Sequence, residues 1–317
     1  MGENTKINAL SPPTTLRGLF THLKDLIMMI RVAHWAKNLF LFIPLFFAGE
    51  LFQLDKLTEV FRGVMAFSLI ASAVYILNDI RDIENDRLHP VKKHRAIPSG
   101  RISTGLAIGT MTVCALSGLL IGWSCGNKFL ITLGLYLILN IGYSLGLKNI
   151  SIVDIMILAA GFVLRIKAGG VISQVGISQW LMIMVFLLAL FLALAKRRDD
   201  ILIEEISGKR VRDAVSGYNS EFLNACLAVV SAIIVMVYIM YTLSPEVIRH
   251  LGTYRLYYTG IFVLAGILRY LQLVYTHKDT RSPTRILYKD RFIQICIILW
   301  ITSFYLLIYY PHVHLWE

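Results

Sequence analysis

About nine apolar stretches run through this chain, and each is long enough to cross a bilayer as a helix, which takes roughly 20 residues. The segments between them are too short to form a soluble domain. We therefore expect an all-α integral membrane protein with a single transmembrane domain over residues 24–310, a polar tail at 1–23 and a short tail at 311–317. The expected spans are 24–47, 58–80, 103–124, 127–146, 150–171, 179–197, 221–243, 255–276 and 290–310.

Basic residues favour one side of this predicted bundle. Most of the 31 lysines and arginines lie in the N-terminal segment and in the loops after the second, sixth and eighth spans. By the positive-inside rule, these loops and the N-terminus are cytoplasmic and the C-terminus lies outside, in the cell (inner) membrane. Topology and attraction to anionic headgroups account for much of the net charge of +11, so we expect a membrane partner and no nucleic acid. The sequence leaves the oligomeric state open.

The stretch LNDIRDIENDRLHP, residues 77–90, places negative charge at the cytoplasmic end of the second span. Asp79, Asp82 and Asp86 lie at i, i+3 and i+7, so they share one face if the helix continues. Carboxylates this close repel one another unless a cation lies among them, and Mg²⁺ prefers oxygen ligands that substrate phosphates complete. We predict that these three residues bind Mg²⁺, with Asn78 in support. The alternative is a solvated helix end whose acids pair with nearby arginines.

Cations follow the acidic stretch directly, in the segment RLHPVKKHRAIPSGRIS. A carboxylate-bound metal beside lysine and arginine is a common means of holding a diphosphate and neutralising it as it leaves. From this segment we select Arg95 as a candidate substrate ligand.

Polar residues also interrupt the first span, in MIRVAHWAKNLFLFIPLFF. Arg31, His34, Lys37 and Asn38 lie at i, i+3, i+6 and i+7, roughly one stripe of an α-helix. Ionisable residues at membrane depth are functional candidates by default, so we select Lys37 and Asn38 as substrate ligands. The alternative is that the long side chains extend to the membrane surface.

The connection between the fourth and fifth spans carries four further candidates. Tyr143, Lys148 and Asp154 gather at its cytoplasmic end, and Arg165 lies deeper, on nearly the same helical face as Asp154. An arginine inside a membrane needs a partner or a wet cavity, so we expect Arg165 to face the bundle interior. The alternative is that it pairs with an acid and only holds the bundle together.

The sixth span ends in LALAKRRDDILIEE, which supplies Lys196, Arg197 and Asp200 as candidates. Basic residues at a helix C-terminus also complement the helix dipole, and this is the alternative explanation for the pair.

Together these residues resemble the UbiA superfamily of membrane prenyltransferases. The N-D-x-x-D-x-x-x-D motif that follows the second helix of that family is matched by Asn78, Asp79, Asp82 and Asp86. Within the superfamily, the chain is more similar to the decaprenyl-phosphate phosphoribosyltransferases. Motifs of that branch are matched at Trp35, Lys37, Asn38, Asp86, Arg87, His89, Pro90, Lys92, Arg95, Ile97, Ser99, Gly100, Tyr143, Ser144, Leu147, Lys148 and Asp154.

Three positions depart from the branch pattern. Ala96 and Pro98 stand where the branch usually has proline and alanine, and Asp200 replaces a glutamate. A shorter acid at position 200 shifts any metal or ribose contact that it makes.

The resemblance implies Mg²⁺-dependent transfer of 5-phosphoribose from phosphoribosyl diphosphate to a polyprenyl phosphate, with release of pyrophosphate. Catalytic roles would fall to Asp79, Asp82, Asp86 and Lys148. Substrate-binding roles would fall to Lys37, Asn38, Asn78, Arg95, Tyr143, Asp154, Arg165, Lys196, Arg197 and Asp200.

The residue types themselves favour this branch. Aromatic prenyltransferases of the superfamily carry a second D-x-x-x-D where this chain has the basic stretch 196–200. One acidic and one basic cluster suit substrates with additional phosphates. Two alternatives remain. One is transfer from a prenyl diphosphate to an aromatic or other acceptor. The other is a cation-dependent transporter or lipid-binding membrane protein, against which the lack of a visible inverted repeat counts.

Overall fold

The computed structural model describes residues 16–88, 92–207, 217–276, 286 and 289–310, which form helices and turns with no strand among them. Nine segments of this described part are long and apolar enough to cross a membrane, and they coincide with the nine expected stretches. The prediction of an all-α bundle is confirmed. The tail at 311–317 and His89 lie outside the described residues. The helices are α1 (Leu16–Ile30), η1 (Val32–Phe42), α2 (Ile43–Phe47), α3 (Leu54–Arg81), α4 (Ile83–Leu88), η2 (Lys92–His94), α5 (Thr104–Ser124), α6 (Asn127–Leu145), η3 (Leu147–Asn149), α7 (Val153–Ser173), α8 (Gln179–Ser207), α9 (Ser220–Leu243), α10 (Pro245–Leu251), η5 (Arg255–Thr259), α11 (Gly260–Thr276) and α13 (Arg291–Tyr309).

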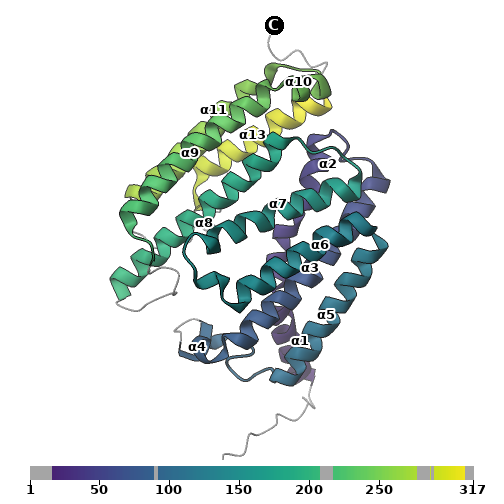
Figure 1. Cartoon of the computed structure of the whole chain (residues 1–317), viewed down its shortest axis with the longest axis vertical. Coiled ribbons are helices and arrows are strands. Elements are labelled where there is room, and N and C mark those ends of the chain that lie inside the picture. The colour runs from purple at the N-terminus through teal and green to yellow at the C-terminus, as the bar shows by residue number, and fades with distance from the viewer. Residues whose placement is uncertain (1–15, 89–91, 208–216, 277–285, 287–288, 311–317) are drawn as a thin grey trace, which may run out of the picture.

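Helices α3 and α7 are the most buried spans, since more than half of the apolar window of each is covered by other parts of the chain. Figure 1 shows α5 and α6 beside α3, and α8, α9, α11 and α13 grouped at the other end of the molecule. One apolar cluster, which includes Leu41, Phe67 and Phe129, joins the first span to α3, α6 and α7. A second, which includes Leu227 and Ile267, joins α8, α9, α11 and α13. Both clusters include residues of α7, Ala168 in the first and Ile155 in the second.

The first span is not the single α-helix that was expected over 24–47. Helix α1 ends at Ile30, Arg31 adopts a left-handed conformation (φ 56°, ψ 48°), and η1 continues as a 3₁₀-helix. The hydroxyl of Ser72 on α3 donates to the carbonyl of Ile30 at 2.7 Å and so pairs a backbone group at the break. At the other end, Pro44 has no N–H and cannot extend an α-helical ladder backward.

The contact between η1 and α7 depends on one glycine. A Cβ atom at Gly169 would lie 2.1 Å from the carbonyl oxygen of Leu41, so only glycine permits this approach of two backbones. The contact fixes the depth of η1 against the centre of the bundle.

Two predicted boundaries differ from the structure. Helix α1 begins at Leu16, within the stretch expected to be a polar tail. Helix α8 continues to Ser207, well past the expected end at residue 197. Lys196 and Arg197 therefore lie in the interior of a long helix, and the helix-dipole explanation for them was wrong.

Candidate functional site

The acidic motif straddles the end of α3. Asp79 lies in the last turn of α3, Asp82 is the residue that caps its C-terminus, and Asp86 lies on the short helix α4. The expectation that the three share one face of a continuous helix was wrong, because the chain leaves helical conformation at Asp82 (φ −95°, ψ 11°).

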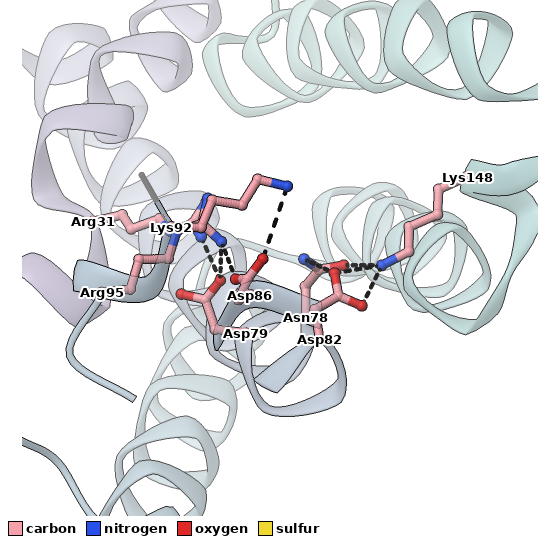
Figure 2. Close-up of polar contacts among 8 residues, drawn as sticks. All are labelled: Arg31, Asn78, Asp79, Asp82, Asp86, Lys92, Arg95 and Lys148. Atoms are coloured by element: carbon pink, nitrogen blue, oxygen red, sulfur yellow. Dashed lines mark hydrogen bonds and ion pairs between the residues drawn. The ribbon is translucent and has the colours of Figure 1, made fainter. Parts of the chain in front are cut away.

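Asp79 and Asp86 form a buried pair around one guanidinium group. Nη1 of Arg95 donates to Oδ1 of Asp79 at 2.9 Å and to Oδ2 of Asp86 at 2.7 Å. Nη2 of Arg31 also binds Oδ1 of Asp79, at 2.5 Å, and Nζ of Lys92 lies 3.8 Å from Asp86 (Figure 2). The two aspartates are only 4% and 2% exposed, and buried carboxylates require such partners. The pair is thus built to hold positive charge between two elements.

Asp82 points to a different partner, away from this pair (Figure 2). Nζ of Lys148, on η3, lies 2.8 Å and 2.6 Å from its two carboxylate oxygens. The same ammonium group donates to Oδ1 of Asn78 at 3.0 Å, and Nδ2 of Asn78 donates to Asp82 at 3.1 Å. This triad of Asn78, Asp82 and Lys148 ties the end of α3 to the connection between α6 and α7.

The 3₁₀ conformation of η1 rearranges the polar stripe. With three residues per turn, positions i and i+3 lie in one line, so His34 and Lys37 align and Asn38 turns aside. His34 interacts electrostatically with Lys37, Arg31, Lys196 and Arg95, which come from three separate parts of the chain. Cations from η1, α8 and the segment after η2 therefore converge beside the acidic pair.

Lys37 keeps an exposed side chain although it lies within an apolar span, and it interacts electrostatically with Arg165 and Arg31. Lys37 therefore lies near enough to the buried Arg165 to interact with it across the interior of the bundle.

Arg165 lies deep in the bundle and is 5% exposed. Its Nε donates to Oδ1 of Asn38 at 2.8 Å, its Nη2 to the hydroxyl of Tyr136 at 2.8 Å, and its Nη1 to the carbonyl of Gly161 at 2.9 Å. Its guanidinium carbon also lies 5.3 Å from the ring centre of Phe162. Within the described part of the chain no carboxylate pairs with it, so the bundle-holding ion pair considered from the sequence is not found. The expectation that Arg165 faces the interior is confirmed.

Arg197 is 1% exposed and lies in a buried network. Its Nε binds Oδ2 of Asp154 at 2.5 Å and its Nη1 binds Oδ2 of Asp200 at 2.6 Å, whereas its buried Nη2 has no hydrogen-bond partner. The hydroxyl of Tyr218 donates to the other oxygen of Asp154 at 2.8 Å. Asp154 and Arg165 share α7 but have different partners. Three of the predicted substrate ligands, Asp154, Arg197 and Asp200, are thus engaged with one another.

Tyr143 and Lys196 lie around this network. Tyr143, near the end of α6, is half-buried and interacts electrostatically with Arg197. Lys196 is exposed and, through its interaction with His34, belongs to the convergent cations.

Magnesium fits the acidic pair better than the predicted triad. Within the residues that the structure describes, no three acids, histidines or cysteines converge on one point, and Asp82 is taken up by Lys148. Proteins commonly bind Mg²⁺ with one or two carboxylates and leave the remaining positions to water and substrate phosphates. Asp79 and Asp86 supply two such carboxylates, whose oxygens already converge on one cationic nitrogen.

Sequence reasoning missed several residues of the site. Arg31 lay on the predicted stripe, but its partner Asp79 was not foreseen. Tyr136 and Ser68, which bind Arg165 and Asn38, stand in apolar surroundings without a local pattern to distinguish them. Tyr218 was ambiguous from the sequence and was not selected, because its contact with Asp154 joins residues far apart in the chain.

Comparisons with known proteins identify relatives of the whole chain and of its fold. The chain is 29% identical to decaprenyl-phosphate phosphoribosyltransferase of Mycolicibacterium smegmatis over 98% of both chains. It is 30% identical to the protein of the same name from Corynebacterium glutamicum, over 90% of this chain and 86% of that one. Its fold matches a UbiA homolog from Archaeoglobus fulgidus bound to GPP and Mg²⁺ with a TM-score of 0.67 and 19% identity, covering 90% of this chain and 99% of that one.

The family assignment follows from the extent of the match. The UbiA prenyltransferase family matches residues 39–295, which include the acidic pair, the triad around Lys148, and Arg165. The chain is therefore a multi-pass membrane transferase that belongs to the UbiA prenyltransferase family.

Proposed function

We propose that this protein transfers 5-phosphoribose from phosphoribosyl diphosphate to a polyprenyl phosphate and releases pyrophosphate. The observation that carries the proposal is the convergence of four cations, Arg31, Lys37, Arg95 and Lys196, around His34, where Arg31 and Arg95 also contact the acidic pair. A single buried pair of carboxylates facing this many cations suits two substrates that together bring more phosphate than one metal neutralises. The relatives from Mycolicibacterium smegmatis and Corynebacterium glutamicum are both named decaprenyl-phosphate phosphoribosyltransferase, which supports the same reaction.

The acidic pair, Asp79 and Asp86, would hold Mg²⁺ on the diphosphate of the donor. Bound there, the metal would neutralise charge on the leaving pyrophosphate. Arg95 and Arg31 now occupy the carboxylates, so we propose that they move their guanidinium groups to phosphate oxygens when donor binds. Arginine suits both partners because its planar fork matches carboxylate and phosphate alike.

The reaction exchanges one bond at the anomeric carbon of the ribose. An oxygen of the lipid phosphate forms the new C1–O bond, and the old C1–O bond breaks with its electron pair leaving on pyrophosphate. The attacking oxygen is already anionic, so no strong general base is needed. Lys37 and Lys196, both exposed within the site, would bind phosphate oxygens, and Lys148 with Asp82 would position the donor beside them.

The membrane orientation is part of the proposal. With the N-terminus and the acidic pair on the cytoplasmic side and the C-terminus outside, the donor would enter from the cytoplasm and the polyprenyl chain from the bilayer. Cysteine labelling from each side of sealed vesicles tests this orientation. Labelling of a cysteine at Glu84 only from outside the cell would reverse it.

One assay tests the reaction. Purified protein is incubated with Mg²⁺, phosphoribosyl diphosphate labelled in the ribose, and a polyprenyl phosphate, and label is followed into the lipid phase. At limiting Mg²⁺, wild type should transfer label, Asp79→Asn should transfer it far more slowly, and Asp55→Asn should match wild type, since Asp55 lies exposed at the opposite end of α3.

Two outcomes overturn the proposal. Turnover with a prenyl diphosphate but not with phosphoribosyl diphosphate would assign the chain to the aromatic-type prenyltransferases of the family. Cation flux in proteoliposomes, without pyrophosphate release from either donor, would assign it to transport.

A further inference from the structure

Tyr218 precedes α9 by two residues and reaches across to the start of α7. Its hydroxyl accepts a hydrogen bond from the backbone N–H of Ile152 at 2.5 Å and donates one to Oδ1 of Asp154 at 2.8 Å. Burial raises the pKa of this hydroxyl, so it keeps its proton and remains able to donate. The residue is therefore held by two bonds to a segment more than sixty positions away in sequence.

The backbone that Tyr218 holds is strained. Ile152 has φ 70° and ψ −49°, a conformation that is an outlier for a β-branched residue. Such a conformation persists only when its surroundings determine it, and the hydrogen bond from the Ile152 N–H to Tyr218 is one such constraint.

A second contact presses the same two segments together. A Cβ atom at Gly217 would lie 2.1 Å from Oγ of Ser151, so the residue before Tyr218 packs directly on the residue before Ile152. The approach of the segment 217–219 to the segment 150–152 is thus close at two adjacent positions.

The strained turn determines where η3 leads into α7. Helix η3 carries Lys148 and ends at Asn149, and the N–H of Asp154 donates to the carbonyl of Ile150 at 3.1 Å, across the turn. Lys148 in turn contacts both oxygens of Asp82. A change in the Ile152 backbone would therefore move the anchor point from which Lys148 extends.

We propose that Tyr218 is a positioning residue, which holds the strained turn at Ile152 and through it keeps Lys148 on Asp82. The importance of Tyr218 for catalysis rests on the proposed function. Its effect on the position of Lys148 does not.

Amine footprinting measures that placement without any substrate. The full-length protein in lipid nanodiscs is treated briefly with an acetylating reagent, and modification of each lysine is quantified by mass spectrometry. In Tyr218→Phe, which removes only the hydroxyl, acetylation of Lys148 should rise about fivefold, the factor that one hydrogen bond contributes. Lys56, which pairs with Glu50 at the far end of α3, serves as the internal reference and should not change.

Two further variants separate positioning from general stability. Ile152→Gly removes the strain at positive φ, so Tyr218→Phe/Ile152→Gly should return Lys148 to near the wild-type rate. Tyr275→Phe loses a comparable phenol, whose hydroxyl donates to the carbonyl of Asn224 at 2.7 Å, and should leave Lys148 unchanged. If Tyr218→Phe is not recovered folded, the double variant should still fold.

The results distinguish this inference from the proposed function. Equal acetylation of Lys148 in wild type and Tyr218→Phe, or a double variant that neither folds nor recovers, overturns the positioning role. A footprint that changes as expected in a protein that fails to transfer phosphoribose upholds the positioning role and overturns the proposed reaction.

Discussion

Lys148 contacts both carboxylate oxygens of Asp82, at 2.8 Å and 2.6 Å, although the two residues are 66 positions apart. The pair joins the end of the most buried helix to a short connection at the same end of the bundle. The acidic motif is thus divided in two: Asp82 pairs with Lys148, whereas Asp79 and Asp86 share Arg95, and Arg31 also binds Asp79.

Replacing Lys148 with methionine should lower the transfer rate by about 100-fold, the usual cost of losing one preorganised charged group near a reacting phosphate. The rate of label transfer to lipid at saturating donor measures this. Lys56→Met is the matched control, because Lys56 also pairs with an acid near α3 but lies at its opposite end. Equal rates in the two variants would remove Lys148 from the site.

The dependence of the transfer rate on Mg²⁺ should differ between variants of Asp79 and Asp82. Chelation with EDTA should abolish transfer, and added Mg²⁺ should restore it. Asp79→Asn should raise the Mg²⁺ concentration for half-maximal rate by at least about tenfold, since it removes one of two carboxylate ligands. Asp82→Asn should lower the rate with a smaller change in Mg²⁺ dependence, because its partner is Lys148. Equal shifts of the half-maximal Mg²⁺ concentration in both variants would instead favour a metal site formed by Asp79, Asp82 and Asp86 together.

Stability should depend strongly on Asn38, which is fully buried between Arg165 and Ser68. Asn38→Leu leaves a buried guanidinium nitrogen without its acceptor, so the free energy of unfolding should fall by about 2–4 kcal/mol. Thermal unfolding in detergent measures this. Asn140→Leu, which loses only a half-buried bond to the carbonyl of Tyr136, should cost about 1 kcal/mol and serves as the comparison.

Substitution by alanine should have opposite effects on stability at Gly169 and Gly134. Gly169→Ala places a methyl group against the Leu41 carbonyl and should reduce the yield of folded protein or its unfolding temperature sharply. Gly134→Ala meets nothing within 4 Å in the middle of α6, so it should be neutral or stabilise by up to about 1 kcal/mol. Similar unfolding temperatures for the two variants would contradict the close packing of η1 on α7.

The sequence was sufficient for the number and place of the spans, because length and hydropathy decide which helices cross a bilayer. It also identified the residue types of the site, since charges in apolar surroundings stand out. Its errors were local: α3 was expected to continue beyond Arg81, and the first span was expected to be an uninterrupted α-helix.

The helical periodicity of the sequence does not show which side chains pair between different helices. Arg165 binds Asn38 across 127 positions and Arg197 binds Asp154 across 43, and no spacing rule connects helices at such separations. Arg197 was therefore selected as a substrate ligand although its side chain is enclosed by two acids, and the ambiguous Tyr218 was not selected.

The 3₁₀ conformation of η1 also sets a length scale. Each residue advances about 2.0 Å, against about 1.5 Å in an α-helix, so the three steps from His34 to Lys37 cover about 6 Å along the axis of η1. The 3₁₀ winding thus places His34 and Lys37 farther apart along the helix axis than an α-helix would, and it brings Lys37 beside the buried Arg165.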